Sequence, residues 1–216
     1  AQLAKLKEEN PTSVIHLAWA PTGTANYQDN REHLSWSQAT QQFSRECAER
    51  NIWLITVGSA VDNQSNNSFP TSYERAKREL KSALSLLQQG NAVITWVRLQ
   101  YVVSVSDLRP RVLRDALQLD STEPFKPRNP YKRHDFIEVR DVSTALWSIV
   151  SEHLLGDIYV GSGRLHTVKD LLAASSRRDQ ESTTNMKPGT IVASEQPFAL
   201  TSVGWFPGET AKLFNF

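Results

Sequence analysis

The chain contains three short apolar runs, and a stretch long enough for a helix follows each of the first two. The runs are "SVIHLAWA" (13–20), "NIWLITV" (51–57) and "NAVITWVRLQYVV" (91–103). Continuous apolar runs of this length are typical of strands that are buried on both faces of a sheet. Strands that alternate with helices predict an α/β fold, a parallel sheet with helices on both faces.

The segments around these runs complete the predicted order of elements. Apolar residues spaced among charged ones predict helices over 32–50 and 71–89. The second half is less regular: it predicts helices over 106–119, 140–154 and 167–175, strands over 135–139 and 157–163, and irregular segments over 120–134 and 175–188. Asp141 and Thr167 are the expected N-caps of the last two helices.

The size of the chain sets the number of domains. With 216 residues, 39% of them hydrophobic, the chain has enough apolar side chains for one compact core and a smaller lobe. The alternation of strand-like and helix-like segments becomes less regular after about Ser104. We therefore expect domains over 1–104 and 105–216. We find neither an internal repeat nor a low-complexity tract.

Charge and cysteine content exclude several classes of function. A formal net charge of +1 provides no overall field for a phosphate backbone or an anionic bilayer, so we expect no nucleic-acid partner. We also expect no membrane segment, because no apolar run approaches about 18 residues and the start lacks the apolar core of a signal peptide. The single cysteine, Cys47, fits a reducing, cytoplasmic setting.

The five histidines and one cysteine show no metal-ligand spacing, so no metal site is expected. His16 is expected to be a buried, hydrogen-bonded residue of its strand rather than a catalytic one. Asn30 is either a structural hydrogen-bonder or an ordinary helix-start residue. The basic residues of 126–133 either bind a diphosphate or form a solvated loop.

One short stretch, 54–80, carries a candidate proton-transfer pair. A predicted strand ends at Gly58 and Ser59, a polar loop follows, and a helix restarts with Tyr73 and Lys77 four residues apart. Residues with this spacing lie on one face of a helix. A phenol is a poor base at pH 7, but a nearby ammonium favours the phenolate and lowers its pKa. The alternative is a surface tyrosine beside a solvated lysine.

An ordered set of short motifs resembles the extended short-chain dehydrogenase/reductase family. The motifs are "VIHLAW", "ITVGSA", "SYERAK", "VRL", "RHDFIEVRDV", "IYVGSG", "TVKDLL" and "GWFP". That family comprises nucleotide-sugar epimerases, dehydratases and reductases. The resemblance extends from Val14 to about Leu213, and it implies a Rossmann-like sheet with a small C-terminal substrate lobe.

The resemblance also implies roles for particular residues. Ser59 would hydrogen-bond the reacting oxygen, Tyr73 would be the acid/base, and Lys77 would be its partner. The cofactor would be NAD or NADP. Its other contacts would be the backbone of Leu17, Ala18 and Trp19, and the substrate, a nucleotide-sugar, would contact Tyr101, Arg133 and His134.

The sequence lacks part of the family pattern, namely the segment that would bind the cofactor pyrophosphate. The nine glycines contain no Gly-rich phosphate turn, and only thirteen residues precede Val14, so the family's first three strands are expected to be missing. The strand at 13–20 would then be an open apolar edge, which a homodimer or a partner chain could cover.

Ser59 and Tyr73 are 14 residues apart, less than is usual for the family, and no Asp-Glu pair follows Ser59. We therefore expect a reductase or epimerase rather than a dehydratase. The alternative is a catalytically silent remnant that binds a nucleotide-sugar or a partner subunit.

Overall fold

The computed structural model describes residues 2–20, 30–60, 70–104, 131–171, 173, 192–193, 200 and 202–214. The chain forms two compact units. One comprises Ala1–Arg98 and Leu154–Ile158, and the other comprises Leu99–His153 and Tyr159–Phe216. The helix expected over 106–119, the segment expected over 175–188 and most of that over 120–134 lie outside the described residues.

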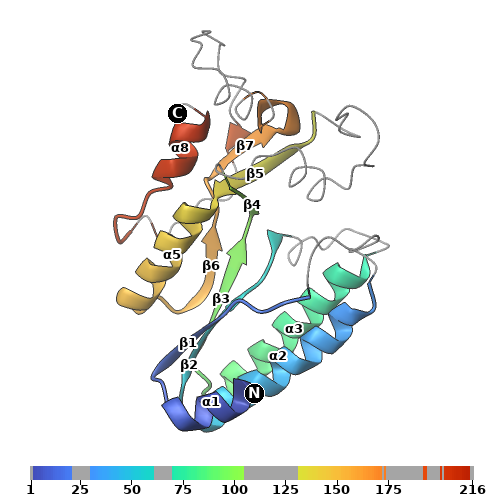
Figure 1. The fold of residues 1–216 in the computed structure, drawn as a ribbon, viewed down its shortest axis with the longest axis vertical. Helices are drawn as coiled ribbons and strands as arrows, with labels where there is room; N and C mark the ends of the chain where they lie inside the picture. The colour runs from blue at the N-terminus through green and yellow to red at the C-terminus, as the bar shows by residue number, and fades with distance from the viewer. Residues whose placement is uncertain are drawn as a thin grey trace. The chain divides into compact units, whose positions relative to one another are not determined.

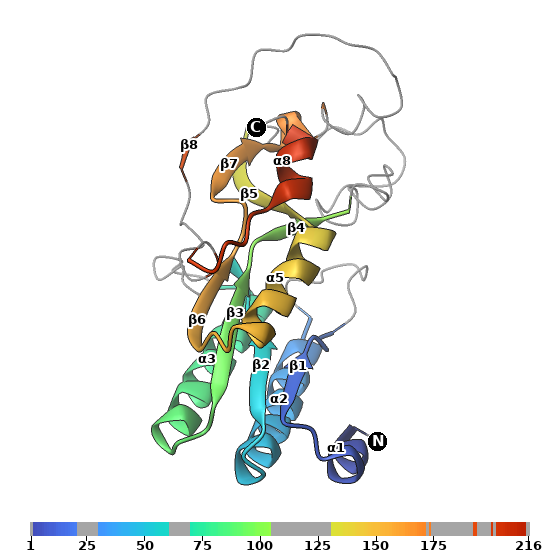
Figure 2. The ribbon, with the colours of Figure 1, turned by 90° about the vertical axis from the view of Figure 1, so that its left-hand side faces the viewer.

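The first unit is built on a sheet of strand order β1-β2-β3-β6. Its elements are α1 (Gln2–Glu9), β1 (Ser13–His16), α2 (Glu32–Glu49), β2 (Trp53–Val57), α3 (Ser72–Gln89), β3 (Ile94–Leu99) and β6 (Gly156–Val160). Leu99 of β3 and the last two residues of β6 belong to the second unit. The pairs β1–β2 and β2–β3 are parallel, with Val14 opposite Leu54 and Leu54 opposite Ile94. Figures 1 and 2 show α2 and α3 lying side by side along the strands. The predicted α/β fold with a parallel sheet is confirmed.

Both faces of β2 and β3 are buried, as their unbroken apolar runs predict, whereas the edge strand β1 leaves Ile15 39% exposed. On the face toward α2 and α3, Leu54 and Trp96 pack in one cluster with helix residues such as Phe43 and Leu80. On the opposite face Ile55 is fully buried. Because successive side chains of a strand alternate between faces, a strand buried on both sides has no polar positions to expose.

Two of the predicted strands have different bounds in the structure. The strand expected over 13–20 ends at His16, and Leu17 is 61% exposed. The strand expected over 91–103 is two strands, β3 and β4 (Tyr101–Val103), which belong to different sheets. The apolar pattern continues through both strands, so hydrophobicity alone does not show where the chain changes sheet.

The second unit holds a sheet of order β4-β5-β7-β8 and two helices. Its further elements are β5 (Arg133–Glu138), α5 (Val139–Ser151), β7 (Arg164–Thr167), β8 (Val192–Ala193) and α8 (Gly208–Phe214). β4 pairs with β5 in parallel, whereas the pairs β5–β7 and β7–β8 are antiparallel. Thr167 caps the helical residues 168–171, as predicted: its Oγ1 accepts a hydrogen bond from the backbone N of Asp170 at 3.1 Å.

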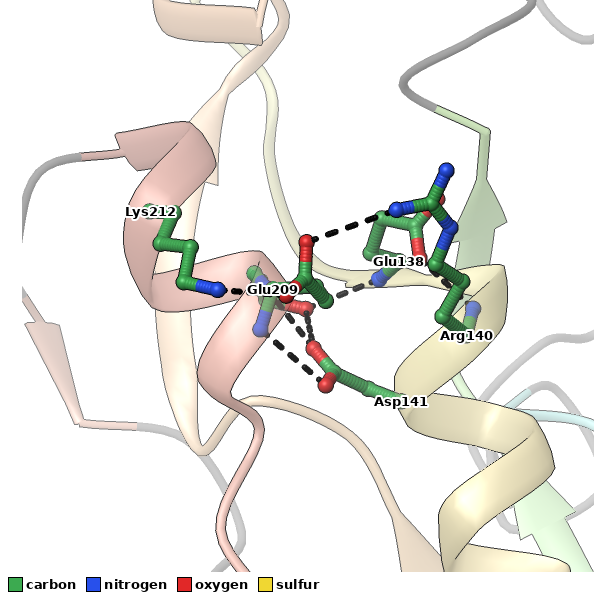
Figure 3. A network of polar contacts seen from close by, with 6 residues as sticks. Glu138, Arg140, Asp141, Glu209 and Lys212 are labelled. Carbon is green, nitrogen blue, oxygen red and sulfur yellow. Dashed lines mark hydrogen bonds and ion pairs between the residues drawn. The ribbon is translucent and has the colours of Figure 1, made fainter.

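Asp141 does not cap α5, and that prediction is wrong. The N-cap of α5 is Glu138, whose carboxylate accepts a hydrogen bond from the backbone N of Arg140 at 2.6 Å. Asp141 lies in the first turn and accepts hydrogen bonds from the backbone N of Glu209 at 3.1 Å and of Thr210 at 2.7 Å (Figure 3). Its carboxylate therefore satisfies the first N–H groups of α8, a distant helix that the sequence pattern did not predict.

No helix in the described part of the chain is long and apolar enough to cross a membrane.

Candidate active site

A capping box fixes the start of α3, the helix that carries Tyr73 and Lys77. Thr71 is the N-cap, and its hydroxyl accepts a hydrogen bond from the backbone N of Glu74 at 3.2 Å. In return the carboxylate of Glu74 accepts one from the backbone N of Thr71 at 3.0 Å. This reciprocal pair of hydrogen bonds defines the first helical turn, which contains Tyr73.

The ammonium of Lys77 is buried at the end of β2. Its side chain comes from the second turn of α3, and the residue is only 4% exposed. Nζ donates a hydrogen bond to the carbonyl oxygen of Val57 at 3.1 Å and lies 3.5 Å from the centre of the Trp19 ring. The carbonyl and the π face together offset part of the cost of removing a charge from water.

Tyr73 faces two aromatic rings from other elements. Its ring is edge-on to His33 at 5.2 Å and to Trp19 at 6.4 Å between centroids. The indole N–H of Trp19 donates a hydrogen bond to Nδ1 of His33 at 3.2 Å. The ammonium of Lys77 lies 5.9 Å from the centre of the Tyr73 ring. The structure therefore brings the predicted Trp19, Tyr73 and Lys77 together.

Ser59 lies two residues beyond Val57, the last residue of β2, and is half-buried. Gly58 precedes it, and its backbone N donates a hydrogen bond to the carbonyl of Val97 at 2.7 Å. A Cβ on Gly58 would lie 2.4 Å from the indole of Trp96. Only a glycine lets the backbone pass this indole without a shift, and the packing thereby fixes the position from which Ser59 projects.

Of the other residues predicted to approach a cofactor, Leu17 is exposed and Ala18 is half-buried, both beyond the end of β1. His16 is within β1, and its ring packs against Phe43 at 5.2 Å. Burial, and secondarily the charge of Lys77, lower the pKa of His16, so the imidazole is neutral at pH 7. Asn30 lies at a helix start: its Oδ1 accepts a hydrogen bond from the backbone N of Glu32 at 3.0 Å.

The residues predicted to bind substrate belong to the second unit. Tyr101 on β4 and His134 on β5 have ring centroids 4.1 Å apart, and Phe136 lies 5.8 Å from His134. Arg133 is exposed. Burial, and then the neighbouring charge of Lys132, lower the pKa of His134 to about 4. The imidazole is thus neutral at pH 7.

A buried carboxylate holds β5 in place next to His134. Asp135 is 2% exposed, and its Oδ1 accepts hydrogen bonds from the backbone N and the hydroxyl of Ser162 at 2.7 and 2.6 Å. Its Oδ2 accepts hydrogen bonds from the backbone N of Gly163 at 2.9 Å and from the hydroxyl of Tyr159. These bonds join β5 to Tyr159 and to the turn of Ser162 and Gly163, all within the second unit.

Sequence reasoning missed two features of the site. The Thr-x-x-Glu pattern at 71–74 is a capping-box signature and could have located the start of α3. His33, which is fully buried beside Tyr73 and Trp19, carries no local signal because its partners are distant in sequence. Among the described residues no group of three histidine, cysteine or acidic side chains could hold a metal ion.

Comparisons with solved structures show which proteins have a similar fold. A Thermus thermophilus UDP-glucose 4-epimerase in complex with NAD has a TM-score of 0.67 and 19% identity, over 95% of this chain and 75% of that chain. A Bacillus anthracis dTDP-glucose 4,6-dehydratase with NAD has a TM-score of 0.66 and 12% identity, over 98% and 72%. A Campylobacter jejuni GDP-mannoheptose C4 reductase with NADP bound has a TM-score of 0.65 and 17% identity, over 95% and 79%.

No family model matches the chain, and no curated protein is a significant match in sequence. The chain spans about three quarters of the length of the three structures above. At these identities the likeness concerns the fold. The chain has the Rossmann-like α/β fold of the extended short-chain dehydrogenases/reductases, the family that its motifs resemble.

Proposed function

We propose that this chain carries the acid/base site of an NAD(P)-dependent nucleotide-sugar reductase or epimerase. The observation that supports this most is the placement of Tyr73 and Lys77 on one face of α3, with the ammonium of Lys77 on the carbonyl of Val57. The carboxyl ends of parallel strands are where open α/β sheets bind their ligands. Ser59, two residues after Val57, is at the same strand end.

The chemistry of these groups fits the nicotinamide end of the cofactor. A phenol, an ammonium and a hydroxyl are the types of group that a carbonyl–alcohol interconversion needs, and α3 and the residues just after β2 supply all three. NAD or NADP, when bound, supplies hydride transfer. Lys77 and the backbone of 17–19 would hold its nicotinamide half. The proposal concerns that half only, because these 216 residues contain no Gly-rich turn for the pyrophosphate.

The proposal gives each of these side chains one role in the reaction. Tyr73 would move the proton to or from the sugar oxygen through its phenol oxygen. Lys77 would favour the phenolate by its charge, and Ser59 would donate a hydrogen bond to the oxygen where negative charge develops. The neutral ring pair of Tyr101 and His134 would contact the nucleotide-sugar by packing rather than by charge.

Binding and turnover can be tested on the 216-residue chain. Titration calorimetry with NAD, NADP and their reduced forms measures cofactor affinity. Turnover is then assayed with UDP-glucose and UDP-N-acetylglucosamine, the nucleotide-sugars of similar enzymes. We expect cofactor binding, and turnover that depends on Tyr73. A folded chain that binds no cofactor and turns over no nucleotide-sugar would contradict the proposal and favour a catalytically silent protein.

The matched control for Tyr73→Phe is Tyr131→Phe. Tyr131 is 69% exposed and has no role in the proposed site, so the loss of its hydroxyl should leave turnover unchanged. An equal loss of turnover in both variants would show that the effect does not come from the site.

A further inference from the structure

The ammonium of Lys77 lies directly on the indole of Trp19. The distance of 3.5 Å from Nζ to the ring centre is well inside the roughly 6 Å over which a cation and an aromatic face attract. Lys77 is 4% exposed, so little water competes with this contact. Among aromatic side chains the indole provides the strongest attraction for a cation. The position of the ammonium is therefore set by the Trp19 ring together with the carbonyl of Val57.

His33 holds that ring. The indole N–H donates to Nδ1 of His33 at 3.2 Å, and the two rings are nearly parallel, 16° apart, with centroids separated by 6.2 Å. Since Nδ1 is the acceptor, a neutral His33 has its proton on Nε2. His33 is completely buried in the first turns of α2. This hydrogen bond fixes the rotation of an indole that lies beyond the end of β1.

The same two rings also contact the proposed acid/base. Tyr73 is edge-on to His33 and to Trp19, with ring centroids at 5.2 and 6.4 Å. Edge-to-face contacts at these distances restrict how a ring can turn. The rings of Trp19 and His33 thus lie against Tyr73, and the ring of Trp19 also contacts the ammonium of Lys77.

We infer that Trp19, oriented by His33, is a positioning residue that holds the ammonium of Lys77 in register with Tyr73. The catalytic meaning of this role rests on the proposed function. The physical part of the inference is the contact itself: the π face of Trp19 binds the ammonium of Lys77 in the chain without cofactor or substrate.

Competitive acylation of amines tests the physical part. The folded chain is treated with a limiting amount of isotopically labelled acetic anhydride, and the labelling rate of each lysine is read by mass spectrometry. Lys77 should react slowly compared with Lys212, whose side chain is 71% exposed. Trp19→Leu keeps an apolar side chain but removes the π face, and we expect it to speed the labelling of Lys77 about tenfold.

Two further variants separate the π face from burial alone. Trp19→Phe keeps a π face and should leave Lys77 largely protected, whereas His33→Leu removes the hydrogen bond to the indole and should give an intermediate rate. Thermal unfolding confirms that each variant is folded. Equal labelling of Lys77 in Trp19→Phe and Trp19→Leu, or no change in either, would overturn the inference.

A kinetic measurement tests the catalytic part. In an active enzyme Trp19→Leu should lower kcat about tenfold with little change in KM, and Trp19→Phe should restore most of it. If the wild-type chain shows no turnover but the labelling pattern holds, the proposed function fails and the positioning of Lys77 by Trp19 stands. If turnover depends on Tyr73 but not on Trp19, the proposed function stands and the inference fails.

Discussion

The carbonyl oxygen of Val57, the last residue of β2, accepts a hydrogen bond from the ammonium of Lys77 at 3.1 Å. This bond joins the second turn of α3 to the end of β2, two residues before Ser59. It places a buried positive charge where a parallel sheet binds ligands, and Tyr73 projects from the preceding turn of the same helix. The contacts that fix this helix and this strand end therefore determine the geometry of the site.

The capping box at the start of α3 should stabilise the fold measurably. Thr71→Ala removes the hydroxyl that accepts from the backbone N of Glu74, and we expect a loss of about 1 kcal/mol in the free energy of unfolding. Urea denaturation measures this loss. Thr71→Ser keeps the acceptor and should behave like the wild type. A Ser variant as unstable as the Ala variant would show that the methyl group matters rather than the hydrogen bond.

Gly58 should not tolerate a side chain. A Cβ there would lie 2.4 Å from the indole of Trp96, so Gly58→Ala forces the strand end or the indole to move. We expect a loss of about 2 kcal/mol in the free energy of unfolding, from overpacking. The control is Gly208→Ala, because no atom lies within 4 Å of a Cβ at Gly208. Equal stability of the two variants in denaturant would contradict the close packing at Gly58.

The helices that carry the site could be predicted closely from the sequence. The predicted ranges 32–50 and 71–89 correspond to α2 at Glu32–Glu49 and α3 at Ser72–Gln89. Both helices show apolar residues at helical spacing, and each begins and ends in polar sequence. Local pattern was enough because the signals that define a helix lie within one or two turns of it.

Long-range pairing could not be predicted in this way. β7 and β8 are short and are held by antiparallel pairing, so their own sequences contain little periodicity. The contact of Lys77 with Trp19 joins residues that are far apart in sequence, and only the fold brings them together. Asp141 shows the same limit, because it stands at a helix start but bonds to a different helix.

The carboxylate of Asp135 should be essential to the second unit. Asp135→Asn replaces an acceptor oxygen by a donor N–H₂ among four donors from Ser162, Gly163 and Tyr159. We expect a loss of about 3 kcal/mol in the free energy of unfolding, since a buried group would be left unsatisfied. Tyr159→Phe removes a single donor and should cost about 1 kcal/mol. Similar losses in the two variants would contradict the central role of Asp135.

His134 should make stability depend on pH in a predictable direction. Its pKa is lowered from 6.5 to about 4, first by burial and then by Lys132. As the pH falls from about 6.5 to about 4, the unfolded chain binds a proton that the folded chain does not, so the free energy of unfolding decreases. His16 and His166, whose pKa values are also lowered, act in the same sense. The contribution of these two histidines to the pH dependence is the same in the wild type and in a His134 variant.

The measurement is therefore the difference between wild type and His134→Gln. The variant should lose part of the slope of unfolding free energy against pH over this range. Titration of the imidazole by NMR should give a pKa for His134 near 4. An unchanged slope together with a pKa near 6.5 would show that the ring is solvated and does not pack against Tyr101 and Phe136.

In the proposed function, Tyr73 moves the proton during hydride transfer. The most direct test of this role is the rate of hydride transfer in a single turnover, followed by NADH or NADPH absorbance, in the wild type and in Tyr73→Phe. Removing a positioned acid/base should slow the step by about 10²–10⁴-fold while cofactor affinity stays within a few fold. A folded Tyr73→Phe variant that transfers hydride at the wild-type rate would contradict the account.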